Sequence, residues 1–234
     1  MSRSSIFTEP LYGGQIFHVY NQTNNKEPLF LIPGDRIRFL SNLEKFVSPF
    51  IDIFSFNLLS NHFHLLIEVL LKEEFLRKTP KYYINNLPTA CRELINADKD
   101  NMHLILKNRF TAMFSGYVTY FNHRHKRKGN FLHRPFCRKW IHSMDYFERA
   151  VYYIHANTVR HGIHQNLLEH EWTSYHSVLA DDDSLIALKK LYKYFGGEEL
   201  LKKYHNERQA IVENEIFVIE EETVFQKRTS EEEE

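Results

Sequence analysis

The stretch Asn57-Leu-Leu-Ser-Asn-His-Phe-His-Leu-Leu-Ile-Glu-Val69 decides the fold. Alternate side chains of a strand share a face, so in segment 62–69 His62 and His64 lie on one face and the apolar residues on the other. Segment 50–59 is a second, strongly apolar strand, and the short break at Ser60 and Asn61 predicts an antiparallel hairpin. Two imidazoles on one face can bind a metal ion; the alternative is that both are ordinary strand histidines.

The segments around this hairpin complete an α+β pattern. Further strands are predicted at 15–21 and 136–141. Apolar residues at three- and four-residue steps predict a helix over 105–121, and Asp35 is predicted to N-cap a helix that ends near residue 47. Between the hairpin and the long helix, 72–81 reads as a charged connection. We therefore expect an α+β domain with a mainly antiparallel sheet.

The C-terminal half of the pattern is helical. Ser143 is predicted to cap a helix over 144–159 that stops near Gly162. The apolar patch 185–195 predicts an additional packed helix. We expect a main domain over 1–180, a helical appendage over 181–212 and an acidic tail over 213–234, the last fifteen residues of which should be disordered.

Composition points to a soluble protein with a substantial core. The 234 residues are 43% apolar and include 19 phenylalanines and 13 tyrosines. There is no run of 18 or more apolar residues and no charged-then-apolar leader, so we expect a soluble, cytoplasmic protein with no membrane partner. Cys91 and Cys137 are expected to be reduced thiols.

The zero net charge hides an asymmetry. Residues 213–234 contain nine glutamates against Lys227 and Arg228, a net charge of −7, so the other 212 residues carry +7. A basic body with an acidic tail fits a nucleic-acid-binding protein. The alternative is that the tail serves only solubility.

The helix predicted over 144–159 carries a second candidate group. Its core face is predicted to hold Met144, Phe147, Val151 and Ile154. The roughly opposite arc is predicted to be exposed and holds Tyr146, Arg149, Tyr153, Asn157 and Arg160. Tyr153 and Asn157 are four residues apart, so their side chains can converge.

An exposed tyrosine between arginines is a plausible phosphate site. Arginine matches phosphate oxygens with two donors, and tyrosine can act as a covalent nucleophile. A divalent ion held by His62, His64 and the carbonyl oxygen of Asn157 would polarise a phosphodiester for attack by Tyr153. The alternative is a helix face whose tyrosines and arginines have no catalytic role.

Four stretches resemble one family. They are His18-Val-Tyr-Asn-Gln-Thr-Asn-Asn25, Ser60-Asn-His-Phe-His-Leu-Leu-Ile67, Tyr120-Phe-Asn-His-Arg-His125 with a following Gly-x-Phe-Leu, and Tyr153-Ile-His-Ala-Asn-Thr-Val-Arg-His-Gly162. Glu171-Trp-Thr-Ser-Tyr175 is a fifth, weaker match. In these motifs, which span roughly residues 15–178, the chain resembles the single-tyrosine HUH transposases, specifically the REP-associated tyrosine transposase branch.

The resemblance implies a ferredoxin-like (RRM-like) fold and a Mg²⁺- or Mn²⁺-dependent enzyme acting on single-stranded, hairpin-bearing DNA. By motif position, Tyr153 matches the nucleophile, and His62, His64 and Asn157 match the metal ligands. The chain departs from the family at Ser60 and Thr158, where the family usually has proline. Relatives include monomers and homodimers, so the resemblance leaves the oligomeric state open.

A basic stretch follows the long central helix and is predicted to track DNA phosphates. Its members, with two arginines of the later helix, are Arg124, Lys126, Arg127, Lys128, Arg134, Arg138, Lys139, Arg149 and Arg160. Interleaved aromatic residues are predicted to stack on unpaired bases, namely Phe121, Phe131, His133, Phe136 and Trp140. The alternative is a solvated loop with core aromatics.

Three functions remain distinguishable at this point. The favoured hypothesis is a metal-dependent single-stranded DNA endonuclease and strand-transferase that forms a 5′-phosphotyrosine through Tyr153. The first alternative is a non-catalytic or domesticated nucleic-acid-binding module of the same fold. The second is a metal phosphodiesterase that uses water, with Tyr153 as a substrate contact.

Overall fold

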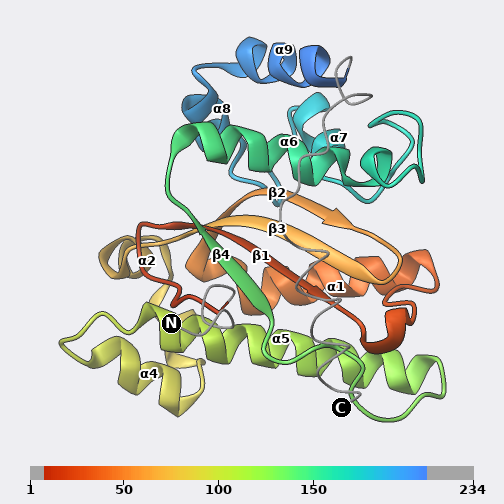
Figure 1. Cartoon of the computed structure of the whole chain (residues 1–234). Coiled ribbons are helices and arrows are strands. Elements are labelled where there is room, and N and C mark those ends of the chain that lie inside the picture. The colour runs from red at the N-terminus through yellow and green to blue at the C-terminus, as the bar shows by residue number, and fades with distance from the viewer. Residues whose placement is uncertain (1–7, 210–234) are drawn as a thin grey trace, which may run out of the picture.

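The computed structural model describes residues 8–209, which form a four-stranded antiparallel sheet with helices on both faces (Figure 1). The strands, in the spatial order β2-β3-β1-β4, are β1 (Ile16–Gln22), β2 (Ile51–Leu58), β3 (His62–Val69) and β4 (Cys137–Ile141). Helix α1 (Pro33–Phe46) joins β1 to β2, and α5 (Met102–Arg124) lies between β3 and β4. This β-α-β-β-α-β order is that of a ferredoxin-like fold, so the predicted fold class is confirmed.

The central hairpin forms as the sequence predicts. Strands β2 and β3 pair antiparallel, and the turn is closed by the Leu59 amide, which donates to the His62 carbonyl over 3.0 Å. Strand β1 pairs with β3 on one side and with β4 on the other. Each predicted strand lies within one or two residues of the observed one. Short 3-10 helices at Asn24–Lys26 and Ser48–Phe50 close two of the connections.

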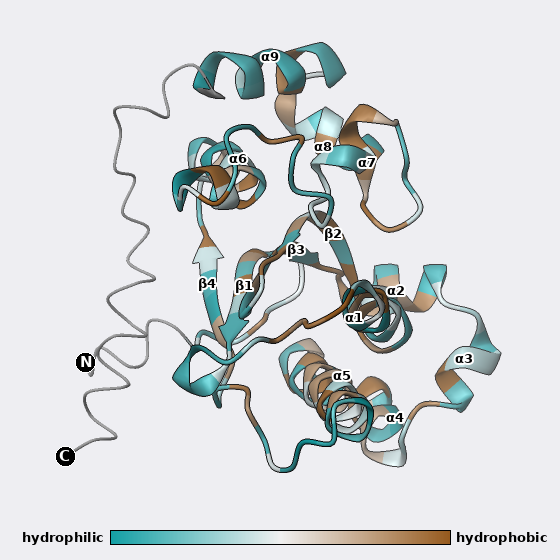
Figure 2. Cartoon of the chain, turned by 90° about the vertical axis from the view of Figure 1, so that its right-hand side faces the viewer, coloured by the Kyte–Doolittle hydropathy of each residue, from teal (hydrophilic) through white to brown (hydrophobic). Residues whose placement is uncertain are grey.

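The apolar face of the sheet packs on α1 and α5 (Figure 2). Phe63 of β3 lies between these helices, with its ring centroid 4.8 Å from that of Phe39 in α1 and 5.7 Å from that of Phe114 in α5. The two aromatic contacts and the alternation of β3 fix its register, since a shift by one residue would turn the apolar set away from the helices.

The charged segment after β3 is helical, not a plain connection. It contains α2 (Lys72–Lys78) and is followed by α3 (Lys81–Asn85) and α4 (Thr89–Asn96). Phe75 of α2 is fully buried and stacks on Phe50 with ring centroids 4.6 Å apart. A single buried aromatic side chain, Phe75, therefore anchors this polar helix to the core. One apolar residue does not make a periodic pattern, so the sequence does not predict the helix.

On the other face of the sheet, α6 (Met144–Arg160) lies next to the strands, α7 (Tyr175–Leu179) and α8 (Leu188–Phe195) lie alongside it, and α9 (Glu198–Gln209) lies farther from the sheet (Figures 1 and 2). Ser143 caps α6 as predicted, its Oγ accepting from the Tyr146 amide over 3.2 Å. Helix α8 confirms the packed helix predicted from the apolar patch. It buries Leu188, Leu191 and Phe195 in the same core as the sheet.

Asp35 does not cap α1 in the way the sequence predicts. The helix begins at Pro33, and Asp35 sits in its first turn, where Oδ2 accepts from the amides of Leu31 (2.8 Å) and Ile32 (3.1 Å). The carboxylate is fully buried and pairs with His125 Nε2 at 3.0 Å. His123 and His125 repeat the His-x-His spacing of His62 and His64, but here His125 is the structural partner of Asp35 and His123 is exposed.

Three further expectations concern the chain as a whole. Cys91 and Cys137 are both buried thiols, as expected. Within residues 8–209 no helix combines the length and the apolar character that a membrane crossing requires. The acidic tail, 213–234, lies outside the described residues.

We expect Asp35→Ala to lower the free energy of unfolding by about 3 kcal/mol, because it leaves His125 and two backbone amides without their partner. Denaturant unfolding at pH 7 measures this, with the exposed Asp98→Ala as the matched control, which should change stability by less than about 0.5 kcal/mol. Equal effects of the two substitutions would contradict the structural role of Asp35.

The penalty should also depend on pH. Burial alone would raise the pKa of Asp35, but the hydrogen bonds from His125 and from the Leu31 and Ile32 amides outweigh it and lower the pKa. A carboxylate with a lowered folded-state pKa stabilises the fold above its unfolded value, near 4, and loses that effect as the pH falls below it. The difference between wild type and Asp35→Ala should therefore shrink in that acidic range.

Candidate functional site

The face of the sheet opposite α1 and α5 carries a row of polar side chains. The register places Tyr20 of β1 opposite His64 of β3, and Asn57 of β2 opposite the same His64. His18 lies two residues before Tyr20 on the same face, and its Nε2 is 3.0 Å from Nδ1 of His64. Such a polar row is unusual inside a fold, because each member must find a hydrogen-bond partner.

Helix α6 covers this row, which corrects one prediction. The arc that holds Tyr153 and Asn157 is not exposed: Tyr153 is only 8% exposed and Asn157 is fully buried, while the predicted core residue Met144 is 45% exposed. Helix α6 is buried on two sides, since Phe147, Val151 and Ile154 join the main core while Tyr152 and Ala156 pack in a second cluster with Leu167 and Tyr175. The sequence could not show this, because the polar face of the sheet and the C-terminal helices supply the partners.

The two strand histidines come together as predicted. Their ring centroids are 5.0 Å apart and the rings are perpendicular. Nδ1 of His62 donates to Oδ1 of Asn61 over 2.7 Å, which leaves its Nε2 with a lone pair. A hydrogen bond that fixes the other ring nitrogen in this way is typical of metal-binding histidines.

His64 is held in the matching state from two sides. When its Nδ1 donates to Nε2 of His18, its own Nε2 keeps the lone pair. That Nε2 lies 3.5 Å from Nδ2 of Asn157, a donor, which is consistent with the same assignment. His18 therefore orients His64, and the amide of Asn157 lies at the other ring nitrogen of His64, Nε2.

Asn157 fits the role of an oxygen ligand. Its Oδ1 is buried and has no hydrogen-bond partner among the described residues. Because the oxygen and nitrogen of an amide occupy equivalent positions, Oδ1 can take the place of Nδ2 next to His64. A buried carbonyl oxygen without a partner is a costly feature unless something binds there.

Tyr153 lies one helical turn before Asn157 and close to both histidines of the row. Its ring centroid is 5.9 Å from that of His64 and 6.1 Å from that of His18. The guanidinium carbon of Arg160 lies 4.6 Å from the centre of the Tyr153 ring. Tyrosine, histidines and amide are thus brought together, whereas Arg149 pairs with Asp145 on the outer side of the helix.

The residues present fit a divalent cation with nitrogen and oxygen ligands. Within residues 8–209, no three His, Cys, Asp or Glu side chains are close enough to hold a metal ion by themselves. A site at His62 and His64 therefore depends on the amide of Asn157. The carbonyl oxygen suits either Mn²⁺ or Mg²⁺, while the two imidazole nitrogens favour the softer Mn²⁺; water or substrate oxygens would fill the remaining positions.

A hydrogen-bonded relay holds α6 from the side away from the sheet. Nδ1 of His205 in α9 donates to the Leu201 carbonyl over 3.0 Å, so its Nε2 accepts from Nδ1 of His155 over 2.9 Å. Nε2 of His155 then accepts from the Ser174 hydroxyl over 2.8 Å. On the sheet side, Asn57 Nδ2 donates to the Ile154 carbonyl over 2.7 Å. These bonds fix the rotation of α6 and hence the direction of Tyr153.

Two further histidines lie near this site, and the sequence motifs assign no role to them. The alternation of His18 with Phe17 and Val19 in the predicted strand indicates that His18 lies on the face opposite these apolar residues. His161, at the end of α6, has its ring centroid 6.3 Å from that of His62. It follows Asn157 by four residues and Tyr153 by eight, the spacing of one helix face.

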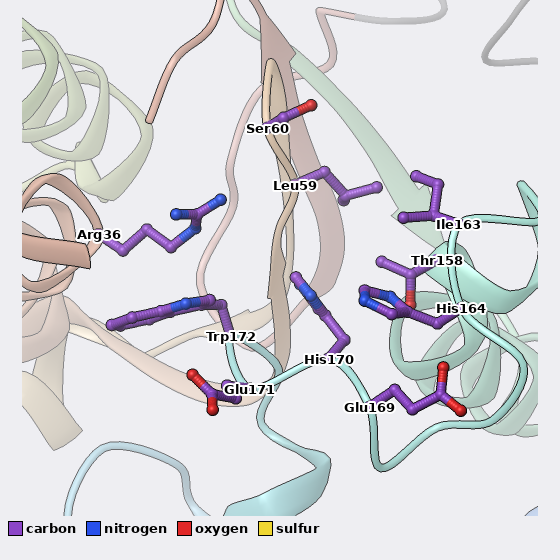
Figure 3. A pocket seen from close by; sticks show the side chains of 10 residues that line it. All are labelled: Arg36, Leu59, Ser60, Thr158, Ile163, His164, Glu169, His170, Glu171 and Trp172. Atoms are coloured by element: carbon purple, nitrogen blue, oxygen red, sulfur yellow. The ribbon is translucent and has the colours of Figure 1, made fainter. Parts of the chain in front are cut away.

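A cavity of about 300 Å³ lies beside the site, at the turn between β2 and β3 (Figure 3). Ser60 lines it, two residues before His62, and so does Thr158, the neighbour of Asn157.

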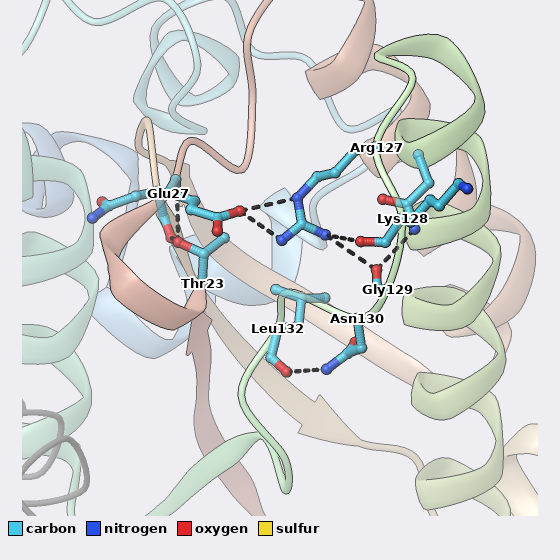
Figure 4. A network of polar contacts seen from close by, with 9 residues as sticks. Thr23, Glu27, Arg127, Lys128, Gly129, Asn130 and Leu132 are labelled. Atoms are coloured by element: carbon cyan, nitrogen blue, oxygen red, sulfur yellow. Dashed lines mark hydrogen bonds and ion pairs between the residues drawn. The ribbon is translucent and has the colours of Figure 1, made fainter. Parts of the chain in front are cut away.

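The predicted DNA-contacting residues are in different surroundings. Four of them are exposed, namely Arg124, Lys126, Lys128 and Arg134. Arg127 instead binds Glu27, through Nε at 3.0 Å and Nη2 at 2.6 Å, and its Nη1 donates to the carbonyls of Lys128 and Gly129 (Figure 4). In the same network the Thr23 hydroxyl donates to the Glu27 carbonyl.

The remaining basic residues also have protein partners. Arg138 donates to the backbone carbonyls of Thr8 and Glu9. Lys139 lies over the ring of Tyr146, with Nζ 5.4 Å from its centre. The predicted basic residues therefore do not form a continuous row of side chains available to DNA, because Arg127, Arg138 and Lys139 contact other parts of the protein. Their role in DNA binding stays a prediction.

The aromatic stacking prediction is wrong for four of its five residues. Phe121, Phe131 and Phe136 are part of the main core, and His133 is buried. Trp140 is 44% exposed. The basic stretch alternates with apolar residues because the loop packs its aromatic side chains inward, a pattern the sequence shares with a stacking surface.

The chain is similar to a solved REP-associated tyrosine transposase. That protein is bound to a REP hairpin; the superposition has a TM-score of 0.46 and 17% sequence identity, over 77% of this chain and 86% of the other. No protein-family model and no curated protein sequence matches the chain. The solved structure belongs to the family that the sequence motifs resemble.

The relay should make stability sensitive to mild acid. Burial lowers the pKa of His205 to about 4 and also lowers the pKa of His155, which the charge of His205 depresses further. The unfolded values lie near 6.5, so the unfolded chain takes up protons first as the pH falls. The stabilising effect is present above about pH 6.5 and is lost as the pH falls toward 4.

At pH 5 we expect the titration of His205 to lower the free energy of unfolding by about 2 kcal/mol relative to pH 7.5. In urea unfolding at pH 7.5 and pH 5, His205→Gln should reduce the difference between the two conditions by about that amount. The exposed His123→Gln is the control and should leave the difference unchanged. An equal pH dependence in His205→Gln and wild type would show that the relay is not the titrating element.

Proposed function

We propose that this protein is a metal-dependent single-stranded DNA endonuclease and strand-transferase of the HUH type, with Tyr153 as the nucleophile. The observation that supports the proposal is the proximity of three groups. The Tyr153 and His64 ring centroids are 5.9 Å apart, and the Asn157 amide, whose buried Oδ1 has no partner among the described residues, lies with its Nδ2 3.5 Å from His64 Nε2. In a phosphodiester bound at this place, the nucleophile and the cation would act on the same phosphorus atom.

A bound Mg²⁺ or Mn²⁺, held by His62, His64 and Asn157, would polarise the phosphodiester and neutralise charge on its oxygens. The phenol oxygen of Tyr153 forms a bond to phosphorus while the bond from phosphorus to the 3′ oxygen breaks. The released oxygen takes up a proton, and the phenol proton is lost to solvent. The 5′ phosphate stays on Tyr153, and attack by a 3′ hydroxyl reverses the step without a separate energy source.

The surroundings of Tyr153 serve this chemistry. Arg160 lies over its ring and brings positive charge to a place where the attacked phosphate gathers negative charge. The low exposure of the ring limits the access of water to a phosphotyrosine, which favours transfer to a strand end over hydrolysis. His18 positions His64 through the bond between their ring nitrogens.

Tyr153→Phe should abolish the denaturation-resistant protein–DNA adduct on a hairpin oligonucleotide with single-stranded flanks, a loss of at least about a thousand-fold, while DNA binding changes little. Denaturing gels with end-labelled DNA measure the adduct, and fluorescence anisotropy measures binding. The control is Tyr152→Phe, the adjacent tyrosine, which packs near His205 on the other side of α6 and should keep full adduct formation.

The same assay separates the two alternatives. Cleavage without an adduct, retained in Tyr153→Phe, would indicate a phosphodiesterase that uses water. DNA binding that is insensitive to EDTA, with neither cleavage nor adduct, would indicate a non-catalytic binding module. Either outcome would falsify the proposed mechanism.

Asn157→Leu should weaken Mn²⁺ binding by about tenfold, because it removes the amide oxygen of the proposed site and leaves the two imidazoles. Loss of the free Mn²⁺ signal in electron paramagnetic resonance measures this affinity in the absence of DNA. Asn96→Leu, at an exposed position of α4, is the matched control. Unchanged Mn²⁺ affinity in Asn157→Leu would remove Asn157 from the site.

A further inference from the structure

The cavity beside the candidate site is built from three separate parts of the chain (Figure 3). We call it the Trp172 pocket. Its walls come from Arg36 of α1, from Leu59 and Ser60 in the turn after β2, and from the stretch that runs from the end of α6 through the loop before α7, which includes Thr158, His170 and Trp172. Its volume of about 300 Å³ is at the small end of the range for ligand-binding cavities.

Three residues that line this pocket carry buried polar atoms without partners. Thr158 Oγ1, His164 Nδ1 and His170 Nε2 are buried and have no hydrogen-bond partner among the described residues. Thr158 is 1% exposed and His170 is 7% exposed. Buried polar atoms in folded proteins are nearly always hydrogen-bonded, so three unpartnered ones around a single cavity point to a ligand that bonds them.

The unpartnered groups in the pocket wall include both hydrogen-bond donors and acceptors. The pKa of His170 is lowered to about 4, chiefly by burial and also by the charge of His164, so its ring is neutral at pH 7. A neutral imidazole offers one donor and one acceptor, and the Thr158 hydroxyl offers both. The ligand must therefore present donors and acceptors side by side.

One wall of the pocket is flat and suited to stacking. The guanidinium carbon of Arg36 lies 5.5 Å from the ring centre of Trp172 and 5.2 Å from that of Phe30. Planar guanidinium and indole groups are the partners on which unpaired bases stack.

The pocket does not suit a metal ion or an anion. No group of three metal-binding side chains is present in the part of the chain that the structure describes. Glu171 and Glu169 bring negative charge to the rim, and Glu169 already accepts from the Gln165 amide (2.9 Å) and from Asn166 Nδ2 (2.6 Å). A neutral, flat molecule with mixed hydrogen-bonding edges fits these walls better than a phosphate.

We propose that the Trp172 pocket binds one unpaired nucleobase of the DNA strand whose phosphate lies at the candidate cation site. The inference rests on the proposed function for its choice of ligand. Its position supports it, because Ser60 precedes His62 by two residues and Thr158 adjoins Asn157, so pocket and site share the same two segments. A base held there fixes which phosphate of the strand faces Tyr153, and so sets the point of cleavage.

The test uses the fluorescence of Trp172. The chain has two tryptophans, so Trp140→Phe leaves Trp172 as the single reporter. This variant is titrated with single strands of about ten nucleotides, made of dT, dC or dA, and with an abasic strand of equal length and charge. Anisotropy of a dye on the strand measures total binding in parallel.

At least one base-containing strand should change Trp172 fluorescence at saturation, and the abasic strand should bind through its phosphates without that change. Adding Thr158→Val, which removes only the hydroxyl, should weaken binding of the base-containing strand by about tenfold and leave the abasic strand unaffected. Thr119→Val, at an exposed position of α5, is the matched control and should change neither.

Three results would contradict the binding of a base in the Trp172 pocket. They are an equal change of Trp172 fluorescence with the abasic strand, the same change with inorganic phosphate alone, and an unaltered affinity of Thr158→Val for the base-containing strand. These outcomes are separable from the fate of the proposed function. Adduct formation through Tyr153 with no response of Trp172 rejects the pocket alone, whereas a base-dependent response without any adduct rejects the catalytic proposal alone.

Discussion

The polar layer between α6 and the sheet is the constraint on which the rest of the structure depends. Imidazoles, amides and hydroxyls there are removed from water, and each unpaired group would cost roughly 1–3 kcal/mol. The layer is stable only in the rotation of α6 that lets Asn57 reach the Ile154 carbonyl and lets His155 reach Ser174. The directions of Tyr153 and Asn157 follow from that rotation.

The same constraint explains why the chain continues beyond α6. A helix that is polar toward the sheet gains little from packing on it alone, so α7 and α9 cover its other side with Tyr175 and His205. The helices after residue 180 share the main core through Leu188, Leu191 and Leu201. The position of the site residues therefore depends on the β2–β3 hairpin, on α6 and on the C-terminal helices that pack against α6.

Much of the fold follows from periodicity. The alternation in 62–69 places Phe63 and Leu65 in the core and His62 and His64 on the other face, and the Ser60-Asn61 break gives the hairpin. Local chemistry also predicts the Ser143 cap correctly. These features depend on neighbours in sequence or on one strand pairing, which is why sequence patterns reveal them.

What the sequence could not give depends on contacts between distant segments. Asp35 is a residue type that commonly caps helices, but here it lies in the first turn and its buried carboxylate pairs with His125, ninety residues later. Tyr153 lies on a polar arc, but that arc is buried because the facing strand is polar too. Arg127 belongs to the basic stretch, but its guanidinium forms an ion pair with Glu27. In each case a long-range partner overrides the local pattern.

The burial of α6 on two sides has a consequence for how its substitutions are read. Every side chain from Ala150 to Thr158 is buried, whether it faces the sheet or the C-terminal helices. Cores tolerate changes of volume poorly, so a saturation survey of this helix would find one unbroken intolerant block rather than a periodic one. Intolerance at Tyr153 or Asn157 would then say nothing by itself about chemistry. Only near-isosteric replacements, which keep the volume and remove a single polar atom, separate the architecture of this helix from its activity.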